Sequence, residues 1–342
     1  MPNRNTSLQA RIWLPWLLLA AVTAQAGDAC PALRTQSTAV DAATRVAAVA
    51  CNEHALWFRP FIDRAGRIAS STVAEAEARR LSDGQSRAWQ RVARYWQDAG
   101  LLSQMTQLPG ALECHGPPDS GLLAAACRGF VIDNAWSAAF LSWVMRQAAL
   151  PGFRASPSHI GYVRDAYLRP EASAYRFTDP RNAKPAVGDM LCYVRHEGRT
   201  YGHEGLRSVA ANGEGLDMHC DVVVAVNPRN DSTAYLIGGN VQQNVTMRML
   251  PLNRNGNFWN LPQRIAGQAA CSPDNEAACN FNRQDWAVLL QLKSAEELAR
   301  LPRALPPSRA APQPDRPTCC VNCVLGSGVP RCPTQPASPT TP

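Results

Sequence analysis

A serine near the start of a predicted helix could act as a nucleophile. In the segment NAWSAAFLSW at 134–143, Ser137 shares a helical face with Leu141 and Val144, so its hydroxyl should point toward whatever the helix packs on. At a helix start, free backbone N–H groups and the positive end of the helix dipole can stabilise an oxyanion. The structural alternative is a small residue at a tight helix–sheet contact, or a first-turn serine that bonds to the backbone.

A histidine on a later predicted strand is the candidate general base. In the run HCDVVVAV at 219–226, alternation places His219 and Asp221 on one face of the strand. The loop that follows should reverse the chain about Asn230, which puts position 240 or 241 opposite His219. Asn240 could then accept the ring N–H and fix the tautomer. Asp221 competes for that role, although residues two apart on one strand are poorly placed to bond. The structural alternative for His219 is a half-buried histidine at a sheet end.

Other residues could line the same site. Trp136 precedes the serine, and His159 follows Pro157, although a loop histidine without a role would look the same. The pairs His196-Glu197 and His203-Glu204 do not have the H-E-x-x-H spacing of zinc peptidases. We therefore expect no catalytic metal and no cofactor.

The order of predicted elements indicates an α+β fold. Three helices are predicted first, from helical spacing at 38–57, from the capping box Thr72-Val73-Ala74-Glu75 with an end near Gly84, and from the stripe Trp89, Val92 and Trp96 with an end at Gly100. A further helix is expected at 135–148. Short β-branched or apolar runs at 189–194, 219–226, 234–237 and 245–250 then predict the strands of an antiparallel sheet.

Cysteine usage and charge limit the compartment and the partners. The chain has twelve cysteines, which indicate an oxidising compartment and several disulfides. The connectivity cannot be read from the sequence, but Cys30 with Cys51, Cys114 with Cys127 and Cys271 with Cys279 are plausible local pairs. Cys192 and Cys220 could lie opposite one another on neighbouring strands, as a disulfide or as a pair of buried thiols. Disulfides are favoured over a zinc site for Cys319, Cys320, Cys323 and Cys332. The net charge of +7 includes Arg4 and Arg11, so a chain without residues 1–26 carries +5, in scattered positions that do not indicate nucleic-acid binding.

Four short segments in order resemble the NlpC/P60 and CHAP superfamily of papain-like cell-wall peptidases and amidases. They are NAWSAAFLSW at 134–143, GDML at 188–191, HCDVVV at 219–224 and IGGN at 237–240. The chain is also similar, over most of residues 40–260, to the bacterial family of unknown function DUF2272. The resemblance implies a papain-like fold in which Ser137 replaces the catalytic cysteine, His219 is the general base and Asn240 is the orienting residue. Serine is far less acidic than cysteine, so it would have to lose its proton as the bond forms.

The chain divides into five expected segments. Residues 1–26 read as a signal peptide, with two arginines, an apolar run from Ile12 to Val22 and a small-x-small cleavage site ending at Ala26. A lipoprotein anchored at Cys30 is disfavoured because the residues before it do not match an anchor signal. Residues 27–110 form an N-terminal helical region, 111–265 the papain-like hydrolase-type domain, 266–300 a C-terminal extension, and 301–342 a Pro-rich, poorly ordered tail.

These features together favour an exported hydrolase, periplasmic or secreted, without a membrane span in the mature chain. The expected reaction is cleavage of amide bonds in peptidoglycan peptides by Ser137, His219 and Asn240, and the expected partner is peptidoglycan or another envelope peptide. One alternative is a non-catalytic envelope-binding protein on an inactivated scaffold. Another is a Ser–His esterase, although the G-x-S-x-G elbow is absent around Ser137. The sequence does not indicate an oligomeric state.

Overall fold

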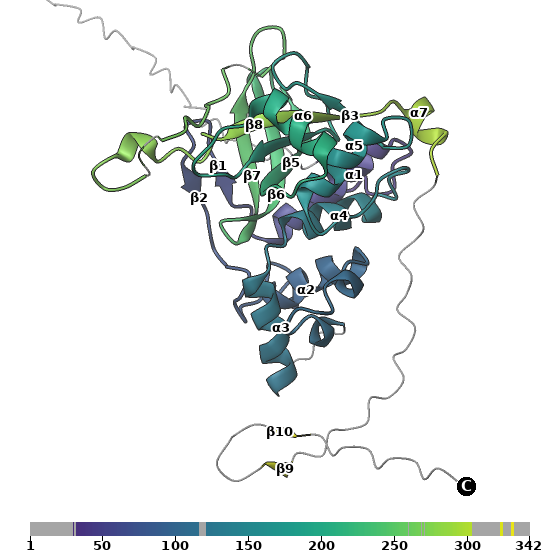
Figure 1. Cartoon of the computed structure of the whole chain (residues 1–342), viewed down its shortest axis with the longest axis vertical. Coiled ribbons are helices and arrows are strands. Elements are labelled where there is room, and N and C mark those ends of the chain that lie inside the picture. The colour runs from purple at the N-terminus through teal and green to yellow at the C-terminus, as the bar shows by residue number, and fades with distance from the viewer. Residues whose placement is uncertain are drawn as a thin grey trace, which may run out of the picture.

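The fold is α+β, with helices packed on one large mixed sheet (Figure 1). The computed structural model describes residues 30, 32–115, 121–258, 260–267, 269, 271–302, 322–323 and 330–331. The helices are α1 (Ala42–Leu56), α2 (Ala88–Asp98), α3 (Gly121–Asp133), α4 (Ser137–Gln147), α5 (His159–Leu168), α6 (Gly202–Asn212) and α7 (Ala295–Ala299), with short 3-10 turns η1 (Leu102–Gln104), η2 (Leu112–Cys114) and η3 (Glu276–Ala278). The predicted signal peptide and the side chains of the tail cysteines lie outside the described residues.

The main sheet has the strand order β2-β1-β7-β6-β5-β4-β8-β3. Its strands are β1 (Phe61–Ile62), β2 (Ile68–Ala69), β3 (Tyr175–Thr178), β4 (Met190–Val194), β5 (Met218–Val226), β6 (Thr233–Val241), β7 (Asn244–Pro251) and β8 (Asp285–Leu292). A separate pair, β9 (Asn322–Cys323) and β10 (Pro330–Arg331), lies in the tail. Neighbouring strands are antiparallel except β1 and β7, which are parallel. The expected antiparallel sheet is therefore a mixed one.

The sheet draws strands from segments that were expected to lie outside it. The two-residue strand β1 comes from the N-terminal region, which was expected to be helical, and it hydrogen-bonds beside β7. Strand β8 comes from the expected C-terminal extension and pairs with β4 on one side and β3 on the other. The described parts of 27–110, 111–265 and 266–300 therefore contribute to one sheet.

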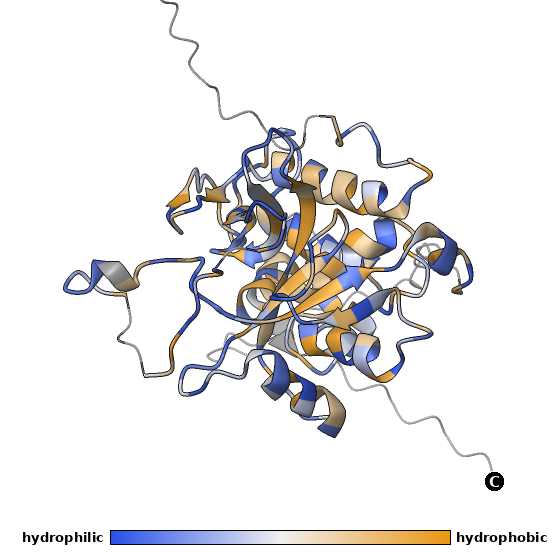
Figure 2. Cartoon of the chain, turned by 90° about the horizontal axis from the view of Figure 1, so that it is seen from above, coloured by the Kyte–Doolittle hydropathy of each residue, from blue (hydrophilic) through white to orange (hydrophobic). Residues whose placement is uncertain are grey.

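Alternation along β5 sorts its side chains between two apolar clusters. Cys220, Val222 and Val224 belong to the larger cluster, which also contains the buried residues of α1 and α4. Val223 belongs to the smaller cluster on the opposite face, with Leu236 and Leu289. Figure 2 shows the orange, apolar strands at the centre of the molecule. This alternation agrees with the prediction and places His219 and Asp221 on the Val223 face.

The segment predicted as a second helix, from the capping box at Thr72, is not helical. Its residues form turns and extended chain between β2 and α2. The backbone N–H of Glu75 donates to the carbonyl of Gln243, 3.0 Å away, and the Glu75 side chain is buried against the start of α4. Tertiary contacts therefore outweigh a local helix signal that has no apolar stripe behind it.

Three of the four disulfides join cysteines that were predicted to pair, and the other joins Cys192 and Cys220, for which the sequence allowed a disulfide or two buried thiols. The four bonds are Cys30–Cys51, Cys114–Cys127, Cys192–Cys220 and Cys271–Cys279. The third joins directly opposed residues of β4 and β5. Such bonds persist in oxidising compartments, so they fit an extracytoplasmic location. Among the described residues, no helix has the length and apolar character needed to cross a membrane.

Candidate functional site

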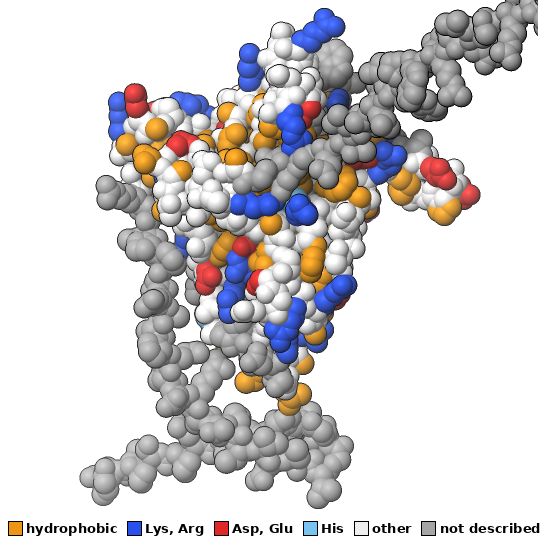
Figure 3. Space-filling model, turned by 180° about the vertical axis from the view of Figure 1, so that it is seen from behind, with side chains coloured by type: hydrophobic (Ala, Val, Ile, Leu, Met, Phe, Trp, Pro, Cys, Tyr) orange, Lys and Arg blue, Asp and Glu red, His pale blue; other side chains and the backbone are white. Residues whose placement is uncertain are grey.

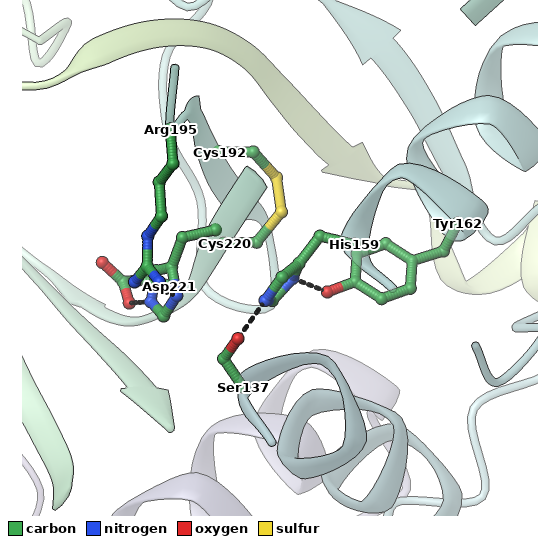
Figure 4. The surroundings of a disulfide bond; sticks show 8 residues. Ser137, His159, Tyr162, Cys192, Arg195, Cys220 and Asp221 are labelled. Atoms are coloured by element: carbon green, nitrogen blue, oxygen red, sulfur yellow. Dashed lines mark hydrogen bonds and ion pairs between the residues drawn. A yellow bond between two sulfur atoms is a disulfide. The ribbon is translucent and has the colours of Figure 1, made fainter. Parts of the chain in front are cut away.

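The hydroxyl of Ser137 contacts a histidine, but the histidine is His159 and not His219. Ser137 Oγ lies 2.7 Å from His159 Nε2 (Figure 4). Ser137 is the first residue of α4 and His159 is the first residue of α5, so two helix starts bring the side chains together. Both residues are buried, with 4% and 3% of their surface exposed. The predicted contact of Ser137 with His219 is absent, since the hydroxyl bonds to His159 alone within the described chain.

Tyr162 contacts the other ring nitrogen of His159. Its hydroxyl hydrogen-bonds with Nδ1, and residues three apart on a helix lie on the same face. Burial, together with the positive charge of Arg195, lowers the pKa of His159 well below its usual range, and burial raises the pKa of Tyr162. Both side chains are therefore neutral at pH 7. The ring carries one proton, which can lie on Nδ1 or on Nε2.

His219 has charged partners on both ring nitrogens. Its Nε2 lies 2.8 Å from Asp221 Oδ1, and its Nδ1 lies 3.0 Å from Arg195 Nη2. A carboxylate only accepts and a guanidinium only donates, so the proton is on Nε2. Burial lowers the pKa of His219 to about 4, because it outweighs the opposing effect of Asp221. His219 is therefore a neutral ring with a fixed tautomer.

Asp221 does bond to the histidine two residues before it on the strand, contrary to the sequence argument. The reason is a glycine on the neighbouring strand. A Cβ at Gly238 would lie 1.8 Å from Asp221 Oδ1 and 2.9 Å from His219 Nε2. The missing side chain of Gly238 leaves the space in which the two side chains turn toward each other.

A buried arginine holds the second oxygen of Asp221. Arg248 Nε donates to Asp221 Oδ2 at 2.8 Å, and its Nη1 donates to the carbonyl of Phe281 and to Asn282 Oδ1. Although burial raises the pKa of Asp221, the positive charge of Arg248 and the hydrogen bonds from Arg248 and His219 outweigh it, so that the pKa falls well below its ordinary value. Asp221 is therefore ionised in the folded protein at neutral pH.

The two histidines belong to one site. Their ring centroids are 5.2 Å apart, with 53° between the ring planes. In Figure 4, the Cys192–Cys220 disulfide lies beside His159 and joins β5, which carries Asp221, to β4, which ends immediately before Arg195. The disulfide therefore ties together the part of the sheet against which the Ser137–His159 pair is held.

Asn240 lies near the start of α4 and has no bond to His219. When its side-chain amide is oriented so that both ends have a partner, the nitrogen donates to Glu75 Oε2 at 3.0 Å and the oxygen accepts from the backbone N–H of Trp136 at 3.2 Å. The pairing of β5 with β6 stops at Val222 and Ile237, and β6 is irregular after Gly238, with φ of +54° at Asn240. This irregularity turns the side chain away from the position that regular hairpin pairing predicts.

Glu75 connects Asn240 with Trp136. The indole Nε1 of Trp136 also donates to Glu75 Oε2, and burial raises the pKa of Glu75. Trp136 is itself fully buried and immediately precedes Ser137. Trp136 and Asn240 therefore position the chain at the start of α4.

A cavity of about 600 Å³ opens beside this site. It reaches Arg195, which contacts His219, and Asn240, which contacts the backbone before Ser137. The residues that line it are Tyr193, Val194, Arg195, His196, Glu197, Asn240, Val241, Gln242, Gln243, Arg248, Arg264, Phe281 and Gln284. Within the described ranges, no cluster of three or more His, Cys, Asp or Glu residues could hold a metal ion.

Several residues of the site were not predicted, although some of them have a signal in the sequence. Tyr162 stands three residues after His159, a helical spacing that could have paired them. Arg248 interrupts the apolar strand β7, and a charged residue at an inward strand position needs a partner. Glu75 was assigned to a helix cap, and Arg195 had no signal because its contact depends on the pairing of β4 with β5.

Comparison with known proteins identifies a family to which the chain belongs. No curated protein and no solved structure matches the chain. The family model described as "Uncharacterized protein conserved in bacteria (DUF2272)" matches residues 83–292, which is more than half of the chain and includes the whole Ser137–His159 and His219–Asp221 site. The chain therefore belongs to the DUF2272 family.

Proposed function

We propose that the protein is an extracytoplasmic serine hydrolase that cleaves amide bonds in peptidoglycan peptides, with Ser137 as nucleophile and His159 as general base. The observation that carries this proposal is the 2.7 Å contact between Ser137 Oγ and His159 Nε2. A serine becomes a useful nucleophile when a neighbouring base accepts its proton during attack. His159 therefore takes the role of general base that was predicted for His219.

The reaction uses the tautomer with the proton of His159 on Nδ1. In that state Nδ1–H donates to the Tyr162 oxygen, and the Ser137 hydroxyl donates to Nε2. As Ser137 attacks the carbonyl, its proton passes to Nε2 and then to the leaving amine, which gives an acyl-enzyme. Water attacks the acyl group with His159 again as base, and the carboxylic acid leaves. Tyr162 holds the ring through both steps.

The start of α4 supplies donors for the oxyanion. The first hydrogen bond of the helix runs from the Phe140 N–H to the Trp136 carbonyl, at 2.8 Å. The N–H groups of Ser137, Ala138 and Ala139 therefore have no partner within the helix. These groups and the helix dipole stabilise negative charge on the carbonyl oxygen.

Charges near His159 set its strength as a base. Burial and Arg195 oppose the imidazolium form, whereas the carboxylate of Asp221 favours it. The resting ring is therefore neutral at pH 7, which is the state a general base needs. His219 also stays neutral. Its contacts with Asp221 and Arg195 fix its ring, which acts as a positioning residue beside the ring of His159.

Two kinds of observation support the substrate and the compartment. The four disulfides fit an extracytoplasmic location. The choice of peptidoglycan peptides rests on the resemblance of the segments around Ser137, Asp189, His219 and Asn240 to cell-wall peptidases and amidases. A Ser–His pair also cleaves esters, so an ester substrate is included in the test.

A second candidate function is favoured by the burial of the site. Ser137 is only 4% exposed, and Arg195 occupies the free nitrogen of His219. These features also suit a binding protein whose scaffold no longer performs catalysis. Such a protein would bind envelope peptides without cleaving them.

The test is incubation of the disulfide-bonded protein with purified peptidoglycan and with model amide and ester substrates. We expect the wild-type protein to release peptide fragments, and Ser137→Ala and His159→Gln to lower kcat by roughly 10³-fold. Ser142→Ala is the matched control, because Ser142 is buried on the same helix but bonds to Ser156. We expect it to retain activity.

Two outcomes would overturn the proposal. One is a wild-type protein that cleaves no substrate while Ser137→Cys does, which would indicate a retained scaffold with disabled chemistry. The other is a Ser137→Ala variant as active as Ser142→Ala, which would place the nucleophile elsewhere.

A further inference from the structure

The cavity beside the site carries guanidinium groups that have unused hydrogen-bond donors. Arg195 uses Nη2 to contact His219 and, at 3.5 Å, the Tyr193 hydroxyl, which leaves its Nε and Nη1 without a protein acceptor among the described residues. Arg264 donates from Nη2 to the carbonyl of Arg199, and its Nε is buried without a partner. A buried donor without an acceptor is uncommon in folded proteins, so Arg264 Nε indicates a missing ligand. Arg195 is exposed, and its free donors line the same cavity.

The charges on the cavity wall favour an anion. Arg248 also lines the cavity, but the buried carboxylate of Asp221 neutralises it. Neither Arg195 nor Arg264 has a carboxylate within ion-pair distance in the described part of the chain, although Glu197 lines the same cavity. The Lys and Arg side chains on the face shown in Figure 3 are scattered. The cavity therefore differs from a general basic surface because two arginines without a carboxylate partner line the same space.

We infer that this cavity is a substrate subsite that binds a carboxylate of the peptide through Arg195 and Arg264. The inference rests on the proposed function and names its substrate class, which is a peptide with an acidic side chain or a free carboxylate near the cleaved bond. A guanidinium fork matches the two oxygens of a carboxylate, and hydrogen bonds between charged groups are about twice as strong as neutral ones.

The remaining wall suits a peptide backbone. The side chains of Gln242, Gln243 and Gln284 line the cavity and offer both amide donors and carbonyl acceptors. A volume of about 600 Å³ falls in the range of small-ligand sites, which run from roughly 300 to 1,000 Å³. The cavity therefore has room for a few residues that include the carboxylate.

Arg195 couples this subsite to the catalytic pair. Its guanidinium contacts His219, whose ring centroid lies 5.2 Å from that of His159. The positive charge of Arg195 opposes proton transfer to His159. A bound carboxylate would offset this charge, so an acidic peptide should increase kcat as well as affinity.

The binding test uses the full disulfide-bonded chain with Ser137→Ala, which holds a peptide without cleaving it. The probes are six-residue alanine peptides, blocked at both ends, in which one glutamate takes each position in turn, and the same peptides with glutamine. We expect calorimetry to show one glutamate position that binds about tenfold more tightly than its glutamine partner, which corresponds to about 1.4 kcal/mol. Raising the salt concentration should reduce this ratio.

Variants of the two arginines test whether the preference for the glutamate peptide depends on Arg195 and Arg264. Arg264→Gln and Arg195→Gln, each combined with Ser137→Ala, should reduce the glutamate preference to less than twofold. Arg254→Gln is the matched control, because Arg254 is exposed and lines a different cavity, and it should keep the preference. Circular dichroism and thermal unfolding would show that each variant is folded.

Binding and cleavage separate this inference from the proposed function. Equal binding of the glutamate and glutamine peptides, or a preference that survives in both arginine variants, would overturn the carboxylate subsite while cleavage by the wild-type protein could still be observed. Selective binding that depends on Arg195 and Arg264, without any cleavage by the wild-type protein, would support the subsite and overturn the proposed hydrolase.

Discussion

The two buried histidines of the site have similar burial and opposite surroundings. His159 lies between the hydroxyls of Ser137 and Tyr162, which are neutral and can each donate or accept a hydrogen bond. His219 lies between the carboxylate of Asp221 and the guanidinium of Arg195, which can each play one role only. The rings nevertheless lie side by side, with 5.2 Å between their centroids.

This difference decides which ring can move a proton. The ring of His159 can exchange the nitrogen that carries its proton, because each hydroxyl can reverse its role. The ring of His219 cannot do so without breaking two bonds to charged groups in a buried site. Burial alone therefore does not identify a catalytic histidine, and the partners of each ring nitrogen must be known.

The largest expected effect comes from breaking the ionic partners of His219. Asp221→Asn removes a buried charge and leaves Arg248 without its carboxylate, so we expect a loss of roughly 3–5 kcal/mol in the free energy of unfolding. Ser137→Ala removes one hydrogen bond between neutral groups and should change it by about 1 kcal/mol. Urea unfolding at pH 7, with the disulfides intact, measures both values.

A matched aspartate checks that the effect belongs to the buried ion pair. Asp231 accepts hydrogen bonds from Thr233 and Tyr235 in the loop between β5 and β6, and it is partly exposed. Asp231→Asn should lower the free energy of unfolding by less than about 1 kcal/mol. If Asp221→Asn is no more destabilising than Asp231→Asn, the ionic partners do not hold His219 in place.

The pH dependence of stability tests the neutral state of His219. Its pKa is about 4 in the folded protein and about 6.5 in an unfolded chain. Between these values the unfolded chain binds the proton and the folded protein does not, so His219 makes stability fall as the pH drops from 6.5 to 4. Below pH 4 its contribution stays constant. The maximum size of this effect is roughly 3 kcal/mol.

Comparison with His219→Gln isolates this contribution. Burial raises the pKa of Asp189 to about 7, which gives the opposite slope over part of the same range, but Asp189 is present in both proteins. The difference in unfolding free energy between wild type and His219→Gln should therefore shrink as the pH falls through this window. A difference that is constant from pH 7 to pH 4.5 would mean that His219 does not stay neutral.

Local patterns predicted much of the framework around these rings. Helical spacing predicted α1 and α2, alternation predicted β5 and the side to which each of its residues points, and cysteine positions predicted three of the four disulfides. The register of β4 and β5 also followed, since Cys192 lies opposite Cys220. These features depend on a few neighbouring residues or on one covalent pairing, which a sequence can show.

The site itself depended on contacts that no local pattern contains. His159 reaches Ser137 because the loop between α4 and α5 brings two helix starts together. Asn240 misses His219 because β6 becomes irregular after Gly238, and a shift of one residue changes which face a side chain occupies. The strand β8 was not predicted, because its pairing with β4 joins segments that are far apart in the sequence.

The smallest expected effect concerns Tyr162, the partner of His159 that a simple Ser–His pair lacks. Tyr162→Phe keeps the aromatic ring at position 162 packed against Phe153 but leaves His159 Nδ1 without a partner. Because the hydroxyl only holds the imidazole, we expect kcat to fall roughly tenfold, about 1.4 kcal/mol, with little change in KM. Steady-state kinetics of Tyr162→Phe beside Tyr167→Phe, on the same helix and outside the site, measures this. Equal kcat values for the two variants would mean that Tyr162 does not orient the base, and that the proton of His159 is held on Nδ1 by the field of its surroundings alone.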